Sequence, residues 1–85
     1  MQDKKRLYLA KTLEYMGNKQ SALYYYLRGE LEYLLHRTDK KVLGWYQKAL
    51  AASPVDSRVH ASAAYCIARY YQDNEQMDIY EKYLV

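Results

Sequence analysis

The sequence predicts an all-α protein of about five helices in antiparallel hairpins, on the evidence of its breakers, its apolar spacing and its length. Only three Gly and one Pro interrupt the chain, and no stretch alternates apolar and polar residues over the length of a strand. Apolar residues instead recur at three- and four-residue intervals, as they do on one face of a helix. Because 85 residues support one modest core, we expect a single domain over residues 1–85.

The first two helices are expected from about Asp3 to Met16 and from near Lys19 to about Arg37. Between them, Gly17 can adopt the left-handed conformation that closes a helix at little cost, and Asn18 tolerates it nearly as well. The second helix carries a wide apolar stripe, which predicts neighbours on two sides. The apolar residues concerned are Leu9, Leu13 and Met16 in the first helix and Leu23, Tyr26, Leu27, Leu31, Leu34 and Leu35 in the second.

The later helices are expected at positions 39–52, 54–72 and from about 73 to the end of the sequence. Thr38 or Asp39 suits the N-cap of the third helix. Ser53 before Pro54 predicts the start of the fourth, because Ser accepts a free amide hydrogen bond and Pro fits the first helical position. The segment Asp73 to Gln76 resembles a capping box, and it precedes a short fifth helix. The apolar face of this last helix contains Met77, Tyr80 and Leu84.

Two similar segments recur at a spacing that is typical of a known repeat. Leu9-Ala10 and Leu43-Gly44 lie 34 residues apart, and the first unit continues with matching large, small and turn residues. On these residues the chain resembles a tetratricopeptide-repeat protein, which implies a superhelix of stacked helical hairpins. The matching residues of the first unit are Leu13, Gly17, Ala22, Tyr26 and Gly29, and the second unit matches at Ala63 but departs at Gln47, Asp56 and His60.

A second register of the repeat fits the same helices. It takes Tyr46, Ala49, Leu50 and Pro54 as the end of one repeat, and Tyr80, Tyr83 and Leu84 echo that ending. The two registers differ in which helix of each hairpin comes first. The sequence therefore does not decide which face of the superhelix is concave. About two and a half units make a minimal array, which self-association or a partner would complete.

The residues that usually carry enzymatic chemistry are sparse and scattered. His36 and His60 lack a metal-ligand partner at helical spacing, and the single Cys66 is six residues from His60, on another side of one helix. The three glycines form no phosphate-binding loop. We therefore expect no enzyme, no cofactor and no metal. A lone cysteine and the absence of a long apolar run or signal peptide predict a cytoplasmic protein without a membrane span.

The resemblance implies a concave groove lined by the first helix of each hairpin. That groove would bind another protein or peptide with acidic and apolar character, because rings supply contact area and lysines supply charge. The alternative is that the aromatic rings cover the core while the lysines form a solvated face. The candidate partner-binding residues are Lys4, Tyr8, Lys11, Tyr15, Lys41, Trp45 and Lys48.

The Tyr-rich segments at positions 24–26 and 70–71 suggest a further contact or self-association surface, because successive helical residues do not share one side.

Three functions are compatible with these residues. The first is a protein-binding adaptor or small chaperone, similar in size and architecture to the short tetratricopeptide-like chaperones of bacterial secretion. The second is a small regulator or inhibitor that docks on a larger protein. The third is nucleic-acid binding, with Tyr rings stacking on bases, although a net charge of +3 is mild for that role. The basic residues it would use are Lys4, Lys5, Arg6, Lys11, Lys40 and Lys41.

Overall fold

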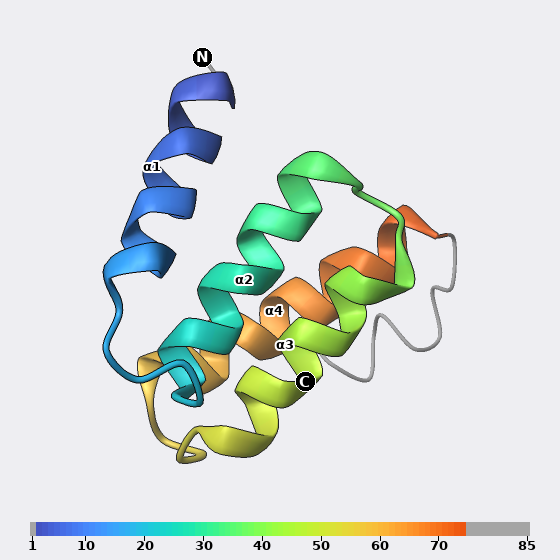
Figure 1. Cartoon of the computed structure of the whole chain (residues 1–85). Coiled ribbons are helices and arrows are strands. Elements are labelled where there is room, and N and C mark those ends of the chain that lie inside the picture. The colour runs from blue at the N-terminus through green and yellow to red at the C-terminus, as the bar shows by residue number, and fades with distance from the viewer. Residues whose placement is uncertain (1, 75–85) are drawn as a thin grey trace.

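Four helices make up the fold of residues 2–74, which are the residues that the structure, a computed structural model, describes (Figure 1). They are α1 (Gln2–Tyr15), α2 (Ala22–Leu35), α3 (Lys40–Ala52) and α4 (Arg58–Asp73). The described part of the chain contains no strand, so the all-α prediction is confirmed. The expected start of a fifth helix at Asp73 is wrong, because Asp73 ends α4 and Asn74 is its C-cap. The rest of that expected helix, with Met77, Tyr80 and Leu84, lies outside the described residues.

Side-chain caps set the starts of α2 and α3. Asp39, one of the two residues predicted for this position, is the N-cap of α3, and its carboxylate accepts a hydrogen bond from the Lys41 amide at 2.9 Å. The second helix begins later than predicted, because Ser21 is its N-cap and accepts from the Tyr24 amide at 3.1 Å. Asn18 holds the preceding turn by accepting from the Gln20 amide at 2.9 Å.

The predicted start of the fourth helix at Pro54 is wrong. The N-cap of α4 is Ser57, whose hydroxyl accepts from the His60 amide at 3.1 Å, whereas Ser53 is the C-cap of α3. The Pro54 carbonyl accepts from both the amide and the hydroxyl of Ser57, at 3.0 and 2.7 Å. Pro54 therefore opens a turn between the two helices, and this turn delays α4 until the second serine.

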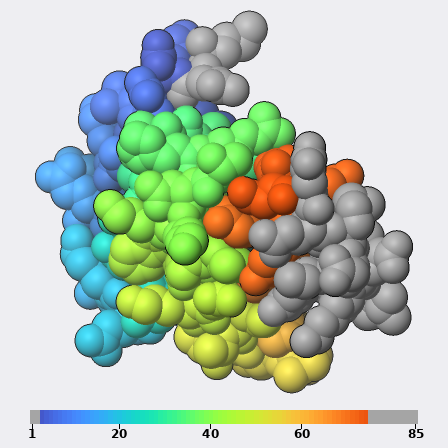
Figure 2. Space-filling model, turned by 90° about the vertical axis from the view of Figure 1, so that its right-hand side faces the viewer, coloured from blue at the N-terminus to red at the C-terminus, as the bar shows by residue number. Residues whose placement is uncertain are grey.

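The second helix is the centre of the arrangement. It packs against α1, α3 and α4, while α3 also packs against α4, and α1 contacts only α2 among the described helices (Figure 1). Figure 2 shows the green and yellow atoms of α3 between the blue atoms of α1 and the orange atoms of α4. No helix in residues 2–74 combines the length and the apolarity needed to cross a membrane.

The main core lies between α3 and α4 and is closed by α2. Its buried residues are Val42, Tyr46, Cys66, Ile67 and Tyr70, against which Tyr26, Tyr33, Leu43, Leu50 and Tyr71 pack.

The tightest contact of this core joins the backbone of α2 to a ring of α3. Tyr46 is fully buried, and its ring lies against Gly29, which is also buried. A Cβ at position 29 would come within 2.7 Å of both Cδ1 and Cε1 of that ring. Since the ring has no free space around it, α2 and α3 approach this closely only because Gly29 has no side chain.

We expect Gly29→Ala to lower the free energy of unfolding by about 1 to 2 kcal/mol, because overpacking costs more than the helix propensity that Ala adds. The matched control is Gly44→Ala in α3, where an added Cβ meets nothing within 4 Å. That variant should gain up to about 1 kcal/mol. Urea unfolding followed by circular dichroism measures both. A Gly29→Ala protein as stable as the Gly44→Ala protein would contradict the close approach.

Candidate functional site

A group of aromatic rings lies on the outside of the α2–α3 pair. Trp45 is half-buried in the middle of α3, and its indole stacks on the Tyr25 ring with centroids 6.2 Å apart and planes at 28°. Tyr24 meets the same indole edge-on, at 6.4 Å and 82°. Such pairs stabilise an aromatic group beyond the area they bury, so these contacts hold the indole in place.

Two cations lie over these rings. The Arg28 guanidinium carbon is 4.8 Å from the Trp45 ring centroid. The Lys48 ammonium is 5.1 Å from the same centroid and 5.8 Å from that of Tyr25. Helical spacing positions both, because Arg28 follows Tyr24 by four residues and Lys48 follows Trp45 by three. We call the five residues Tyr24, Tyr25, Arg28, Trp45 and Lys48 the Trp45 surface.

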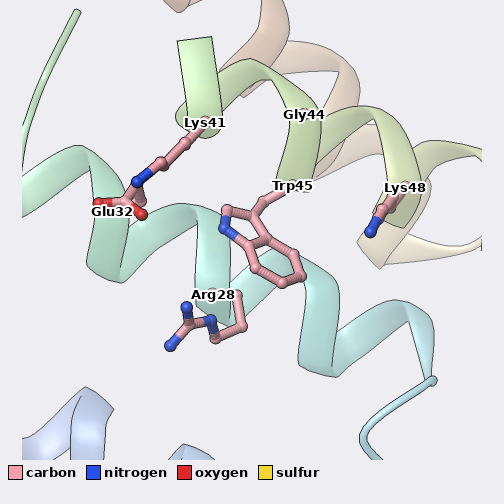
Figure 3. A pocket seen from close by; sticks show the side chains of 6 residues that line it. All are labelled: Arg28, Glu32, Lys41, Gly44, Trp45 and Lys48. Carbon is pink, nitrogen blue, oxygen red and sulfur yellow. The ribbon is translucent and has the colours of Figure 1, made fainter. Parts of the chain in front are cut away.

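A hollow of about 390 Å³ opens at the Trp45 surface. Figure 3 shows Arg28 on one side of the indole, Lys48 beyond it and Lys41 reaching toward Glu32. Three cations and one carboxylate thus line the hollow, which gives it an excess of positive charge. Its lining residues are Arg28 and Glu32 from α2 and Lys41, Gly44, Trp45 and Lys48 from α3.

Arg28 and Lys48 are held by rings rather than by carboxylates. Within residues 2–74 the ion pairs involve Arg6, Arg37 and Arg69, and neither cation of the Trp45 surface belongs to one. The Nε atom of Arg28 is also buried without a hydrogen-bond partner in this part of the chain. A guanidinium without a carboxylate partner in a hollow is suited to bind one from a ligand.

The structure brings three of the seven predicted site residues together and leaves four apart. Lys41, Trp45 and Lys48 line one hollow. The α1 residues Lys4, Tyr8, Lys11 and Tyr15 are exposed and do not line it.

The α1 tyrosine rings do not cover the core, because Tyr8 is 74% exposed and Tyr15 83% exposed. The four α1 residues form a solvated face.

Sequence reasoning missed the contribution of α2 to this site. Tyr24, Arg28 and Glu32 follow one another at four-residue intervals, so they form one strip of the helix. That spacing was visible in the sequence. What it did not reveal is that this strip lies beside Trp45, because the pairing of α2 with α3 is a long-range contact.

A second polar cluster lies inside the helix packing, around the carboxylate of Glu30. One oxygen, Oε1, accepts from the Tyr46 hydroxyl at 2.5 Å, from Arg69 Nη2 at 3.2 Å and from the Cys66 thiol at 3.5 Å. Arg69 also donates to the Tyr46 hydroxyl at 3.0 Å, and its guanidinium lies 3.8 Å from the Tyr33 ring centroid. The cluster joins α2, α3 and α4 and pairs Glu30 with Arg69, whose Nε atom is buried without a hydrogen-bond partner in the described residues.

This environment keeps the thiol and the phenols of the cluster protonated. Burial, reinforced by the Glu30 carboxylate, raises the pKa of Cys66 to about 11 and that of Tyr26 to about 12. Burial likewise raises the pKa of the Tyr46 phenol. At neutral pH Cys66 is therefore a thiol rather than a nucleophilic thiolate. Within residues 2–74 no group of three or more His, Cys, Asp or Glu side chains is placed to hold a metal ion.

We expect the free energy of unfolding to fall as the pH rises from about 9 to 11. The unfolded chain releases the Cys66 proton near pH 9 and the Tyr26 proton near pH 10, while the folded protein retains both until about pH 11 and 12. Urea unfolding at successive pH values measures the decline. In Cys66→Ser the decline should begin nearer pH 10. A stability that stays constant through pH 11 would sink this prediction.

Comparison of the chain with protein-family models, with curated proteins and with solved structures gives no match. The feature of the described residues that offers binding chemistry is the Trp45 surface, where a hollow meets an indole and two cations that have no ion-pair partner within residues 2–74.

Proposed function

We propose that the protein is a non-enzymatic binding module that holds an acidic polypeptide segment at the Trp45 surface. The observation that carries this proposal is the placement of Arg28 and Lys48 over the Trp45 ring, without a carboxylate partner in the described residues. A guest carboxylate would pair with these cations, and the half-buried indole would supply apolar contact area. Both groups are already held in place, which lowers the cost of ordering them on binding.

The helix arrangement supports a tetratricopeptide-like role as an adaptor, a small chaperone or a docking regulator. In the proposed repeat α1 and α3 are the first helices of successive hairpins. Leu9 in α1 is buried, and Leu43, 34 residues later in α3, packs against the core. The two equivalent positions of the proposed repeat are therefore both used for packing between helices. A single cysteine, protonated and buried, suits a reducing cytoplasm.

The same surface is less suited to nucleic acid. Bases stack on a free aromatic face, whereas Arg28 and Lys48 already lie over Trp45. On α1, Arg6 is paired with Asp3 at 2.8 Å, which reduces the charge available there. These contacts favour a polypeptide as the partner.

The proposal predicts that Lys48→Glu weakens binding of a short acidic peptide by about tenfold, because an attractive charge becomes a repulsive one. The probe is a capped peptide of Glu and Leu residues, too short to form a stable helix. Trp45 is the single tryptophan of the chain, so its fluorescence reports binding at this surface directly. The matched control is Lys5→Glu, which makes the same charge change at an exposed position of α1.

Equal affinities of the two variants would remove the Trp45 surface as the binding site. A single-stranded oligodeoxythymidine titrated in parallel tests the other class of partner. If that oligonucleotide binds and outcompetes the peptide, and if its affinity falls steeply with added salt, nucleic-acid binding replaces our proposal.

A further inference from the structure

The hollow at the Trp45 surface adjoins two others along α2. A hollow of about 260 Å³ shares Arg28 with it and continues between α1 and α2 over Leu31. A third, of about 440 Å³, shares Ala10 and Leu31 with the second and extends to Leu7 and Leu35. Because each hollow shares lining residues with the next, the three adjoin one another on this side of α2, and we call them together the channel.

The channel exists because α1 and α3 flank α2 without contacting each other. Tyr24, Arg28, Leu31 and Leu35 are spaced by four, three and four residues, so they share one face of α2. This face forms the floor of the channel, and α1 and α3 form its walls. Any helix laid on the floor would fill the place beside α2 that no described helix occupies.

The two ends of the channel differ in chemistry. At the end formed by the start of α1 and the end of α2, Leu7 is 58% exposed and Leu35 is 43% exposed. Farther from Leu35 stand the cations Arg28 and Lys48, whereas Lys41, at the start of α3, lies beside Glu32 near the end of α2. A guest must therefore offer apolar side chains at one end and carboxylates at the other.

We propose that the guest of this channel is an amphipathic helix of a different protein, about three turns long, with apolar residues over Leu31 and Leu35 and carboxylates beside Arg28 and Lys48. This inference rests on the proposed function and specifies its partner. From Tyr24 to Leu35 the floor runs about 16 Å at 1.5 Å per residue, which sets the length. The binding mode is a helix in a groove.

A helix suits this channel better than an extended strand. The floor is a helix face, which offers no strand edge to pair with an extended backbone. A strand laid over Leu31 and Leu35 would lose water from amides and carbonyls that find no partner there, at a cost of about 1–3 kcal/mol each. A helix satisfies its own backbone groups and presents only side chains.

Charge separates a foreign helix from a second copy of the chain. The exposed face of α1 bears Lys4 and Lys11, which would meet the cations of the channel. In α2 the carboxylate of Glu30 is already taken by Arg69 and Tyr46. The acidic residues of α1, Asp3 and Glu14, line the wall of the channel itself, and Asp3 is paired with Arg6. A second copy would therefore have to bring this same wall into its partner's channel.

The test uses a synthetic helix-forming peptide of about fourteen residues, with Leu on one face of its first half and Glu on the same face of its second half. The control peptide has the same composition with Leu and Glu spread around the helix. Each is titrated into the full chain and followed by Trp45 fluorescence and by the gain of peptide helicity in circular dichroism. We expect only the amphipathic peptide to bind and become more helical.

The deciding variant is Leu35→Glu, which places a carboxylate at the apolar end. This variant should bind the amphipathic helical peptide at least about tenfold more weakly and bind the short acidic peptide with unchanged affinity. Leu7→Glu on the facing wall repeats the test if the first variant folds poorly. The matched control is Val55→Glu, an exposed apolar residue in the α3–α4 turn, where no change is expected.

The outcomes separate the two proposals. If Lys48→Glu weakens the binding of both peptides and Leu35→Glu weakens the binding of neither, the proposed binding function stands and the proposal of a helical guest is wrong. If the amphipathic peptide and its control of the same composition bind equally well, the proposal of a helical guest is likewise wrong. If sedimentation shows dimers, or if a peptide of residues 75–85 binds more tightly than the designed one, the channel belongs to the chain itself and our inference is overturned.

Discussion

The seating of the Tyr46 ring against the backbone of Gly29 is the contact on which the rest of the structure depends. It brings α2 and α3 close together and buries the ring completely. The next residue back along the helix, Trp45, is turned by about 100° and therefore lies at the outer seam of the same pair. There it meets Arg28, one residue before Gly29. One close approach thus sets both the inner core and the outer Trp45 surface.

A core made of tyrosines must also provide partners for buried hydroxyls. The chain has twelve Tyr and no Phe, so polar contacts recur wherever rings pack. Tyr46 donates to Glu30, and Tyr33 donates to Asp73 at 3.1 Å, where Arg37 also binds. Hydrogen bonds are directional, unlike apolar contacts, so the Tyr46–Glu30 pair fixes how α3 is placed along α2, and the Tyr33–Asp73 pair fixes how α4 is placed along α2. Glu30 and Arg69 are better explained by this role than by catalysis.

The sequence predicted the helix limits and caps that local spacing controls, but it did not predict how the helices are oriented relative to one another. The limits of α1 and α3 and the cap at Asp39 follow from local patterns, and Lys41, Trp45 and Lys48 share a hollow because they share a helix face. On α1 the predicted face is one residue away from the one that lines the channel, a rotation of about 100°. Which side of α1 meets α2 is set by Leu9 and Leu13, and the periodicity does not show where α3 lies relative to them.

The weak attachment of α1 gives the channel one adaptable wall. Among the described helices, α1 packs on α2 alone. Of its described side chains, only Leu9 and Leu13 are buried, with less than a tenth of their surface exposed. Elements with few buried contacts open at lower free energy than the core. The opposite wall, α3, is fixed by Tyr46 and does not move without disrupting the core. A guest that contacts both walls would therefore adjust the position of α1 against a rigid α2–α3 pair, so binding and the stability of α1 are coupled.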